Sequence, residues 1–237
     1  MSSDLSQTTG VILAGGLGTR LRAAVADRPK VLAEVNGRPF LAHLLDQMGA
    51  AGIRRAVLCT GYLGEQVEEA FGDTHGDIQL AYSREDAPLG TAGALRLALE
   101  LMGSDPVLAI NGDSYMDADL QAMADTHRAS GANSTILLTE VPDVARYGKV
   151  LLDSGGALTS FEEKGGDRAP GWINAGLYLL SQEVLESIPT GRPVSLEKET
   201  LPSWIGRGLF GCQQRGRFID IGTPESYAEA AAFFQGA

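Results

Sequence analysis

The sequence predicts an α/β fold in which a doubly wound, mostly parallel sheet carries helices on both faces. In the first half of the chain, short apolar runs that end in glycine or aspartate alternate with stretches of helical spacing. This alternation indicates βαβ units, because neighbouring parallel strands need a crossover that is usually a helix. The 237 residues are enough for one large domain, and no low-complexity linker or internal repeat divides them.

The first half contains the clearest elements. Strands are expected at residues 10–15, 54–61 and 105–113. Between the first two, apolar residues recur at three- and four-residue steps from Phe40 to Met48, which predicts a helix that begins after a proline and ends near a glycine. Further helices are predicted over residues 63–71 and 91–102.

The second half has a different pattern, in which strand-like runs follow one another. They cover residues 134–140, 148–153, 158–163 and 173–180, separated by glycine, proline and aspartate turns. This suggests a mixed sheet appended to the doubly wound half. We therefore expect one domain over residues 1–237, with a flexible tail over residues 1–9, a first lobe over about residues 10–140 and a second lobe over about residues 141–237.

Composition excludes several classes of function. A formal net charge of −11 argues against a protein that tracks nucleic-acid phosphates, although a few local cations could still hold a small anion. No stretch of twenty apolar residues could span a membrane, and the first nine residues do not resemble a secretory signal. Cys59 and Cys212 lack metal-ligand spacing, so we expect buried reduced thiols in a cytoplasmic protein. The sequence leaves assembly into a homo-oligomer open.

The stretch GVILAGGLGTRLR, residues 10–22, is the strongest local signal for a ligand. Gly15, Gly16 and Gly18 follow the first predicted strand, where a doubly wound sheet often cradles phosphate, and glycine lets backbone N–H groups approach phosphate oxygens closely. Arg20 could oppose the charge of a triphosphate. The spacing fits neither the dinucleotide fingerprint nor the P-loop. The alternative is a strand-to-helix turn whose glycines only permit close packing.

Several motifs in order resemble the sugar-1-phosphate nucleotidylyltransferases, which join a sugar 1-phosphate to a nucleoside triphosphate and release pyrophosphate. They are LAGGLGTRLR (13–22), PKVLAEVNGRPFL (29–41), REDAPLGTAGAL (84–95), NGD (111–113), FEEKGG (161–166), WINAGLYLL (172–180) and GRFIDIGTPESYAEA (216–230). The resemblance spans nearly the whole chain. It implies a Rossmann-like, GT-A-like nucleotidyltransferase fold with an appended sugar-binding lobe.

The resemblance also implies roles for individual residues. Arg20, Lys30 and Asp113 are expected to be catalytic, and Asp113 and Asp220 are expected to hold Mg²⁺, which prefers oxygen ligands and takes few carboxylates. Without the ordered motifs, Asp113 would read as a turn residue and Asp220 as a neighbour of a helix cap. The residues expected to bind the nucleotide are Gly15, Gly16, Gly18, Thr19, Glu85, Asp86, Gly90 and Thr91.

The sugar phosphate is expected to bind the second lobe. Lys164 is assigned to its phosphate and Glu163 to its hydroxyls, and Gly148, Asn174 and Gly176 are expected to complete the sugar pocket. The alternative for Glu163 and Lys164 is an ordinary solvated charge run.

Guanine is the expected base. The Glu85 and Asp86 carboxylates could accept hydrogen bonds from its N1–H and N2–H₂ groups, and backbone N–H groups of the small neighbouring residues could donate to O6. The form of the PLGTAG loop and the compact chain resemble the D-glycero-α-D-manno-heptose 1-phosphate guanylyltransferases. We therefore expect transfer of GMP from GTP to such a heptose 1-phosphate. The alternatives are mannose 1-phosphate with GTP, glucose 1-phosphate with UTP or ATP, and a non-catalytic regulatory subunit that binds nucleotide sugar.

Overall fold

A parallel core of β6, β4, β1 and β7 organises the computed structural model, which describes residues 5–16, 18, 21, 25, 28–162 and 168–235. Strand β1 lies between β4 and β7 and is parallel to both, and β6 extends the sheet beyond β4. The bounds are β1 Thr9–Leu13, β4 Arg55–Thr60, β6 Ile78–Arg84 and β7 Val107–Asn111. The doubly wound arrangement predicted for the first half is confirmed.

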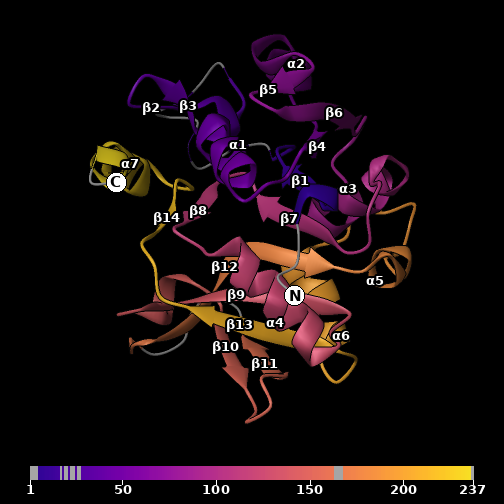
Figure 1. Ribbon diagram of the computed structural model, residues 1–237. Helices are drawn as coiled ribbons and strands as arrows, with labels where there is room; N and C mark the ends of the chain where they lie inside the picture. Colours follow the sequence, from indigo (N-terminus) through magenta and orange to yellow (C-terminus); the bar gives the residue numbers. More distant parts are fainter. Residues whose placement is uncertain are drawn as a thin grey trace.

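Strands of the second half continue the same sheet and do not form a separate one (Figure 1). Strand β12 pairs antiparallel with β7 and with β9, and β13 pairs parallel with β9. The mixed character that the sequence predicts is therefore present, but it arises where β12 joins the parallel core. The bounds are β9 Ser134–Val141, β10 Lys149–Leu152, β11 Leu158–Glu162, β12 Gly171–Leu180 and β13 Leu209–Gln214.

Short strands and helices complete the fold. The remaining strands are β2 Glu34–Val35, β3 Arg38–Pro39, β5 Thr74–His75, β8 Ser114–Met116 and β14 Phe218–Asp220. The helices are α1 Phe40–Ala50, α2 Gly64–Phe71, α3 Gly90–Ala98, α4 Leu120–Ser130, α5 Gln182–Glu186, α6 Leu201–Trp204 and α7 Pro224–Gln235. The helix predicted over residues 91–102 ends earlier, and Leu99–Leu101 continues it as a 3₁₀ turn.

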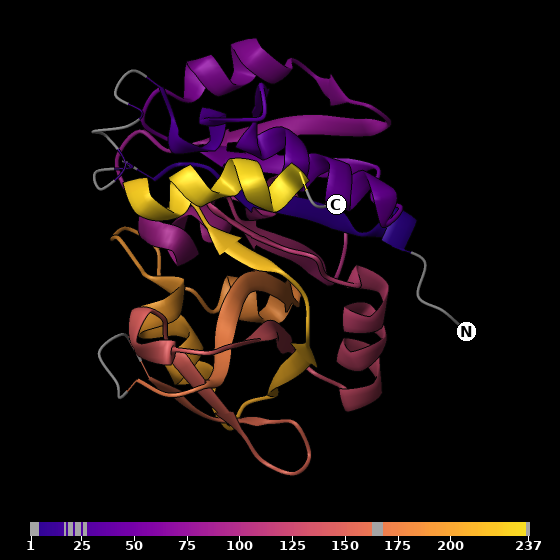
Figure 2. The same ribbon diagram turned by 90° about the vertical axis from the view of Figure 1, so that its left-hand side faces the viewer.

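Alternate residues of the core strands point to opposite faces, which gives two buried clusters. Ile12, Leu58 and Ile110 belong to the cluster beneath α1, α2, α4 and α7. Val11 and Val57 belong to the other, beneath α3, α5 and α6. Figure 2 shows α7 beside α1, although these helices lie far apart in the sequence. Because both faces are covered, the strands can be apolar throughout, as in parallel sheets generally.

The N-terminal segment differs from the prediction. Leu5–Gln7 form a 3₁₀ turn, Leu5 is buried in the α1 cluster, and Thr9 already belongs to β1. The flexible tail predicted over residues 1–9 is therefore wrong for residues 5–9, because a single leucine among polar residues has a core position to fill.

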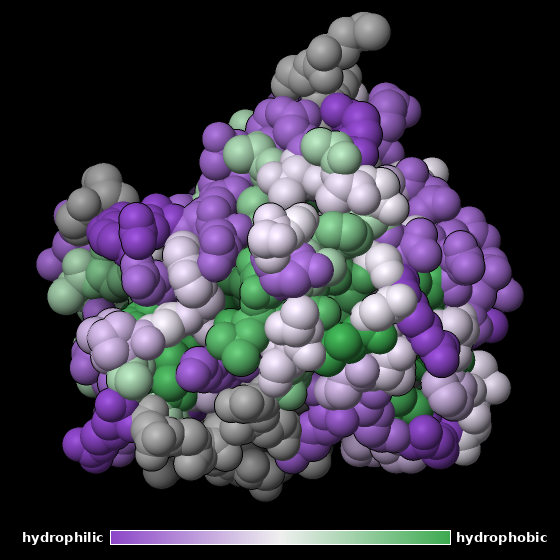
Figure 3. Space-filling view, turned by 90° about the horizontal axis from the view of Figure 1, so that it is seen from below, coloured by the Kyte–Doolittle hydropathy of each residue, from purple (hydrophilic) through white to green (hydrophobic). Residues whose placement is uncertain are grey.

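Other sequence expectations concern thiols and membranes. Cys59 and Cys212 are free and buried, as predicted, and burial raises the pKa of the Cys59 thiol to about 12. No helix among the described residues is long and apolar enough to cross a bilayer. The lower end of the molecule, at β10 and β11, shows apolar side chains among polar ones (Figure 3), and Leu151 of β10 is 43% exposed.

Candidate active site

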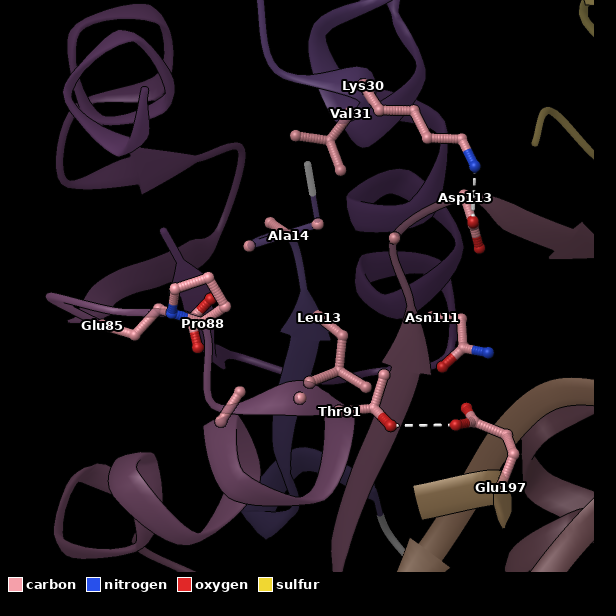
Figure 4. Close-up of a pocket in the computed structure, with 15 residues that line it drawn as sticks. Leu13, Ala14, Lys30, Val31, Glu85, Pro88, Thr91, Asn111, Asp113 and Glu197 are labelled. Atoms are coloured by element: carbon pink, nitrogen blue, oxygen red, sulfur yellow. Dashed lines mark hydrogen bonds and ion pairs between the residues drawn. The ribbon is translucent and has the colours of Figure 1, made fainter. Parts of the chain in front are cut away.

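A cavity of ≈ 310 Å³ opens beyond the carboxyl ends of β1 and β7 (Figure 4). The strand order reverses here, since β4 lies on one side of β1 and β7 on the other. Such a switch point is where open α/β sheets bind their ligands. Gly15 and Gly16 line it from the loop after β1, Gly112 and Asp113 from the loop after β7, and Gly90 from the start of α3.

Glycine is required where the two strand ends meet. The Gly112 N–H donates to the Leu13 carbonyl at 3.0 Å, and a Cβ at residue 112 would lie 2.5 Å from that oxygen. On the other side of the cavity, a Cβ at Gly15 would lie 2.8 Å from Oε1 of Glu85. Gly112, the middle residue of the NGD motif, therefore allows the loop after β7 to lie close to the end of β1. Gly15 leaves room for the Glu85 carboxylate.

Lys30 and Asp113 line one end of the cavity, and Asp220 lies beside them without lining it; we call these three residues the charged end (Lys30, Asp113 and Asp220). Nζ of Lys30 lies 2.5 Å from Oδ2 of Asp113, and the Lys30 side chain is only 12% exposed. Asp220 accepts a hydrogen bond from the Gly222 N–H, and a Cβ at Gly222 would also lie 3.3 Å from the Lys30 ammonium.

Strand pairing brings these carboxylates together. β14 lies antiparallel to β8 and places Asp220 opposite Ser114, next to Asp113. The Ile221 N–H donates to the Asp113 carbonyl at 2.9 Å. Among the residues that the structure describes, no group of three or more His, Cys, Asp or Glu side chains is arranged to hold a metal ion. The donors at this point are a pair of carboxylates, a set that suits Mg²⁺ bound mainly by phosphate and water.

Glu85 lies at the opposite end of the cavity from Asp113 (Figure 4). Its Oε2 accepts a hydrogen bond from the Leu89 N–H at 3.0 Å. Desolvation by burial raises the pKa of this carboxyl above its usual value of 4.5, and the bond from Leu89 opposes that shift. Asp86, which the sequence groups with Glu85, does not line the cavity and faces a neighbouring hollow with Tyr62 and Arg84.

Thr91 lines the cavity, but its hydroxyl already has partners. It donates to Oε2 of Glu197 at 2.9 Å and accepts from the Leu196 N–H at 2.7 Å. Beside it, Gly90 has φ +72°, and a Cβ there would lie 2.5 Å from the Val194 carbonyl. The start of α3 is therefore fastened to the segment before the π-helix Leu196–Thr200.

Glu197 also lines the cavity, and the sequence reading assigned it no role. Together with Thr91 and Asn111 it forms what we call the polar wall (Thr91, Asn111 and Glu197). The sequence signal that could have pointed to Glu197 was the acidic run LEKET (196–200), but that run contains two glutamates, Glu197 and Glu199. Glu199 instead pairs with Arg192 at 2.7 Å on the surface, and only the folded chain distinguishes the two.

Asn174 and Gly176, expected in the sugar pocket, lie on β12 where its pairing with β9 is irregular. Nδ2 of Asn174 donates to the fully buried Tyr178 hydroxyl at 2.7 Å, and its Oδ1 accepts from the Gly176 N–H at 2.9 Å. Gly176 has φ +81°, and a Cβ there would lie 3.0 Å from Nδ2 of Asn111. These residues support the Asn111 side of the cavity without lining it.

The other predicted site residues have varied positions. Gly18 has φ +58° and lies beside Lys30, as a phosphate loop would require. Gly148 precedes β10 and does not line the cavity. Thr19, Arg20, Glu163 and Lys164 lie outside the described residues, and their roles stay predictions.

The comparisons with known proteins agree with this geometry. A family model described as nucleotidyl transferase matches residues 9–236. A mannose-1-phosphate guanylyltransferase from Mycobacterium tuberculosis is 36% identical over 230 residues, which cover 95% of this chain and 64% of that protein. A D-glycero-alpha-D-manno-heptose 1-phosphate guanylyltransferase from Aneurinibacillus thermoaerophilus is 34% identical over 221 residues, covering 93% of this chain and 95% of that protein.

Solved structures give the same result. HddC from Yersinia pseudotuberculosis superposes with a TM-score of 0.85 at 33% identity, covering 96% of this chain and 99% of that chain, and it has also been solved in complex with GMP-PN. The chain thus spans just under two thirds of the mycobacterial relative and almost all of the other two. Since one family model covers nearly its full length, the chain belongs to the nucleotidyl transferase family.

Proposed function

We propose that this protein transfers GMP from GTP to a sugar 1-phosphate, giving a GDP-sugar and pyrophosphate. A phosphate oxygen of the sugar 1-phosphate attacks the α-phosphorus of GTP, the bond from that phosphorus to the β-phosphate oxygen breaks, and pyrophosphate leaves. Phosphoryl-type transfers of this kind depend mainly on positioning and on neutralising charge.

The observation that carries the proposal is the charged end. Lys30 is nearly buried beside Asp113 and Asp220 at one end of a cavity that begins at a glycine loop. A triphosphate whose terminal groups follow the loop would present its α-phosphate to the Lys30 ammonium. Arg20, from the same loop, is proposed to bind the departing pyrophosphate, and Lys164 the phosphate of the sugar.

Asp113 and Asp220 are the residues that would hold Mg²⁺. The ion, when bound, supplies charge neutralisation for the phosphates. Nζ of Lys30 lies 2.5 Å from Oδ2 of Asp113, so the ammonium is placed beside the proposed metal-holding carboxylates, where it would add positive charge next to the triphosphate.

Guanine is proposed as the base because of Glu85. Its carboxylate lies at the end of the cavity away from Asp113, where it can accept hydrogen bonds from N1–H and N2–H₂ of guanine. Adenine carries no donor at either of these positions. The relatives support the same choice, since each compared enzyme is named as a guanylyltransferase and HddC was solved with GMP-PN.

D-glycero-α-D-manno-heptose 1-phosphate is the proposed acceptor, because the relative of that name matches over 95% of its own length. Mannose 1-phosphate is the second candidate, favoured by the 36% identity to the mycobacterial enzyme. A regulatory subunit without activity is disfavoured by the presence of Lys30, Asp113 and Asp220 together.

The test is a matrix of substrates. Pyrophosphate release is measured with GTP, ATP, UTP and dTTP against the heptose 1-phosphate, mannose 1-phosphate and glucose 1-phosphate, with Mg²⁺ and with a chelator. We expect GTP and a manno-configured sugar to give the highest kcat/KM. A preference for ATP or a pyrimidine nucleotide would refute guanylyl transfer, and no pyrophosphate with any pair would refute the activity altogether.

A further inference from the structure

The polar wall contains a buried acceptor without a donor. Oδ1 of Asn111, at the end of β7, is buried and has no hydrogen-bond partner among the described residues. The other amide atom, Nδ2, lies 3.5 Å from the Tyr178 hydroxyl. Buried polar atoms are nearly always hydrogen-bonded, so the amide atom at this position calls for a partner from outside the described residues.

Glu197 presents a second acceptor to the same space. Its Oε2 is used by Thr91 and by the Ser195 hydroxyl at 3.2 Å. No hydrogen bond among the described residues reaches Oε1. Figure 4 shows the Glu197 carboxylate and the Asn111 amide pointing toward one another across the cavity. Two facing acceptors repel unless a donor lies between them.

The charge of the wall limits what that donor can be. A phosphate is excluded beside the Glu197 carboxylate, since like charges repel in a partly buried site. The Lys30 ammonium and the Glu85 carboxylate line other parts of the cavity. What fits is a neutral group that donates hydrogen bonds, and a sugar ring supplies such hydroxyl groups.

Asn111 is suited to a hydroxyl in either orientation of its amide. If Oδ1 faces the cavity, a hydroxyl can donate to it. If the amide turns over, the Tyr178 hydroxyl can donate to Oδ1, Nδ2 faces the cavity, and a hydroxyl can accept from it. Gly176 leaves room for the amide, because a Cβ at that position would lie 3.0 Å from Nδ2.

We propose that Asn111 and Glu197 together bind a hydroxyl of a sugar ring and select substrates that carry it. The proposal rests on the proposed nucleotidyl transfer. Two rings meet at this wall. One is the ribose of the nucleotide and the other is the ring of the sugar 1-phosphate, and the hydroxyls of either ring can donate to both acceptors. Thr91 acts as a positioning residue that fixes the Glu197 carboxylate.

The test measures discrimination, not activity alone. Binding of GTP, 2′-deoxy-GTP and 3′-deoxy-GTP, and of mannose 1-phosphate and its single-deoxy analogues, is titrated by calorimetry with the full chain. The variants are Asn111→Leu, which is nearly isosteric and removes both polar atoms, and Glu197→Gln, which retains an acceptor for Thr91. Glu69→Gln, exposed on α2, is the matched control.

The wild-type protein is expected to prefer one hydroxyl-bearing ligand over its deoxy analogue by about tenfold to a hundredfold, and Asn111→Leu should remove most of that preference. Glu197→Gln should reduce it, and Glu69→Gln should leave it unchanged. Loss of discrimination among the nucleotides assigns the wall to the ribose, and loss among the sugar phosphates assigns it to the acceptor.

Unchanged discrimination for both rings in both variants would overturn the proposal. If Asn111→Leu does not fold, Glu197→Gln carries the test. Because binding is measured with each ligand alone, the result does not depend on turnover. Absence of pyrophosphate release in the substrate matrix would therefore refute the proposed function while leaving this measurement interpretable.

Discussion

The charged end and the polar wall of one cavity are held in place by different kinds of contact. Asp113 and Asp220 are fixed by backbone pairing between β8 and β14, and Gly112 presses the β7 loop against β1. Thr91 and Glu197 are instead joined by side-chain hydrogen bonds between segments more than a hundred residues apart in the chain. Backbone pairing leaves the position of a charge little freedom, whereas a side-chain wall can change its partners without disturbing the sheet.

The largest effect is expected at the charged end. Asp113→Asn and Asp220→Asn should each lower kcat by about a thousandfold or more, because losing a carboxylate proposed to hold the divalent cation would cost several kcal/mol of transition-state stabilisation. Steady-state pyrophosphate release with Mg²⁺ measures this. Asp77→Asn, on the exposed β5–β6 turn, is the control. Full activity in either variant would remove that residue from the metal site.

A substitution of Gly90 tests the contact between the start of α3, which carries Thr91 of the polar wall, and the Val194 carbonyl. Gly90→Ala should cost about 3 kcal/mol of unfolding free energy or more, since strain at φ +72° is added to a clash with the Val194 carbonyl. Gly131→Ala is the matched control, because Gly131 also has positive φ, lies in the left-handed region at φ 61° and ψ 33°, and its Cβ would meet nothing within 4 Å. It should cost only about 1–2 kcal/mol. Equal urea midpoints for the two variants would show that the Val194 contact contributes nothing.

A smaller effect is expected for recognition of the nucleobase, which is proposed for Glu85 and involves neither the charged end nor the polar wall. Glu85→Gln should reduce the preference for GTP over ATP by about tenfold to a hundredfold, because a guanine N–H loses its charged acceptor. Comparison of kcat/KM for the two nucleotides gives the ratio. Asp86→Gln, next to it but facing the neighbouring hollow, should change the ratio less. A larger effect at Asp86 would move guanine recognition out of the cavity.

The smallest effect concerns pH. Burial raises the pKa of Glu85 in the folded protein, so the folded state binds more protons than the unfolded state between the ordinary value of 4.5 and the raised one. The unfolding free energy should therefore fall as the pH increases through that window. Glu85→Gln should lose this slope, as measured by urea unfolding at a series of pH values. A slope that persists in the variant would assign it to another group.

Within the charged end, Asp113 was predictable from its position just after a strand end that the sequence pattern marks well, whereas the roles of Lys30 and Asp220 came from the family resemblance. Asp113 closes an apolar run, and parallel strands bring their carboxyl ends to one edge. Lys30, Gly15 and Glu85 likewise lie within contiguous motifs.

The polar wall was not predictable in the same way. Glu197 acquires its place only through Thr91 in the folded chain, and nothing in LEKET distinguishes it from Glu199. Leu5 was also missed, because one leucine among polar residues has no periodicity and its burial depends on the α1 cluster. Glu85 and Asp86 both line the neighbouring hollow, but only Glu85 also lines the cavity, a difference that the sequence could not show because the chain bends after β6.

The pairing of β14 with β8 also has a consequence for the order in which the protein becomes competent during synthesis. The ribosome delivers residues from the N-terminus, and the glycine loop, Lys30 and Asp113 all precede the second half of the sheet. Asp220 arrives about a hundred residues later, on a short strand that completes β8. The parallel core can therefore form early in synthesis, whereas Glu197 of the cavity and Asp220 on β14 arrive only near its end, so the proposed activity has to wait for the last strand.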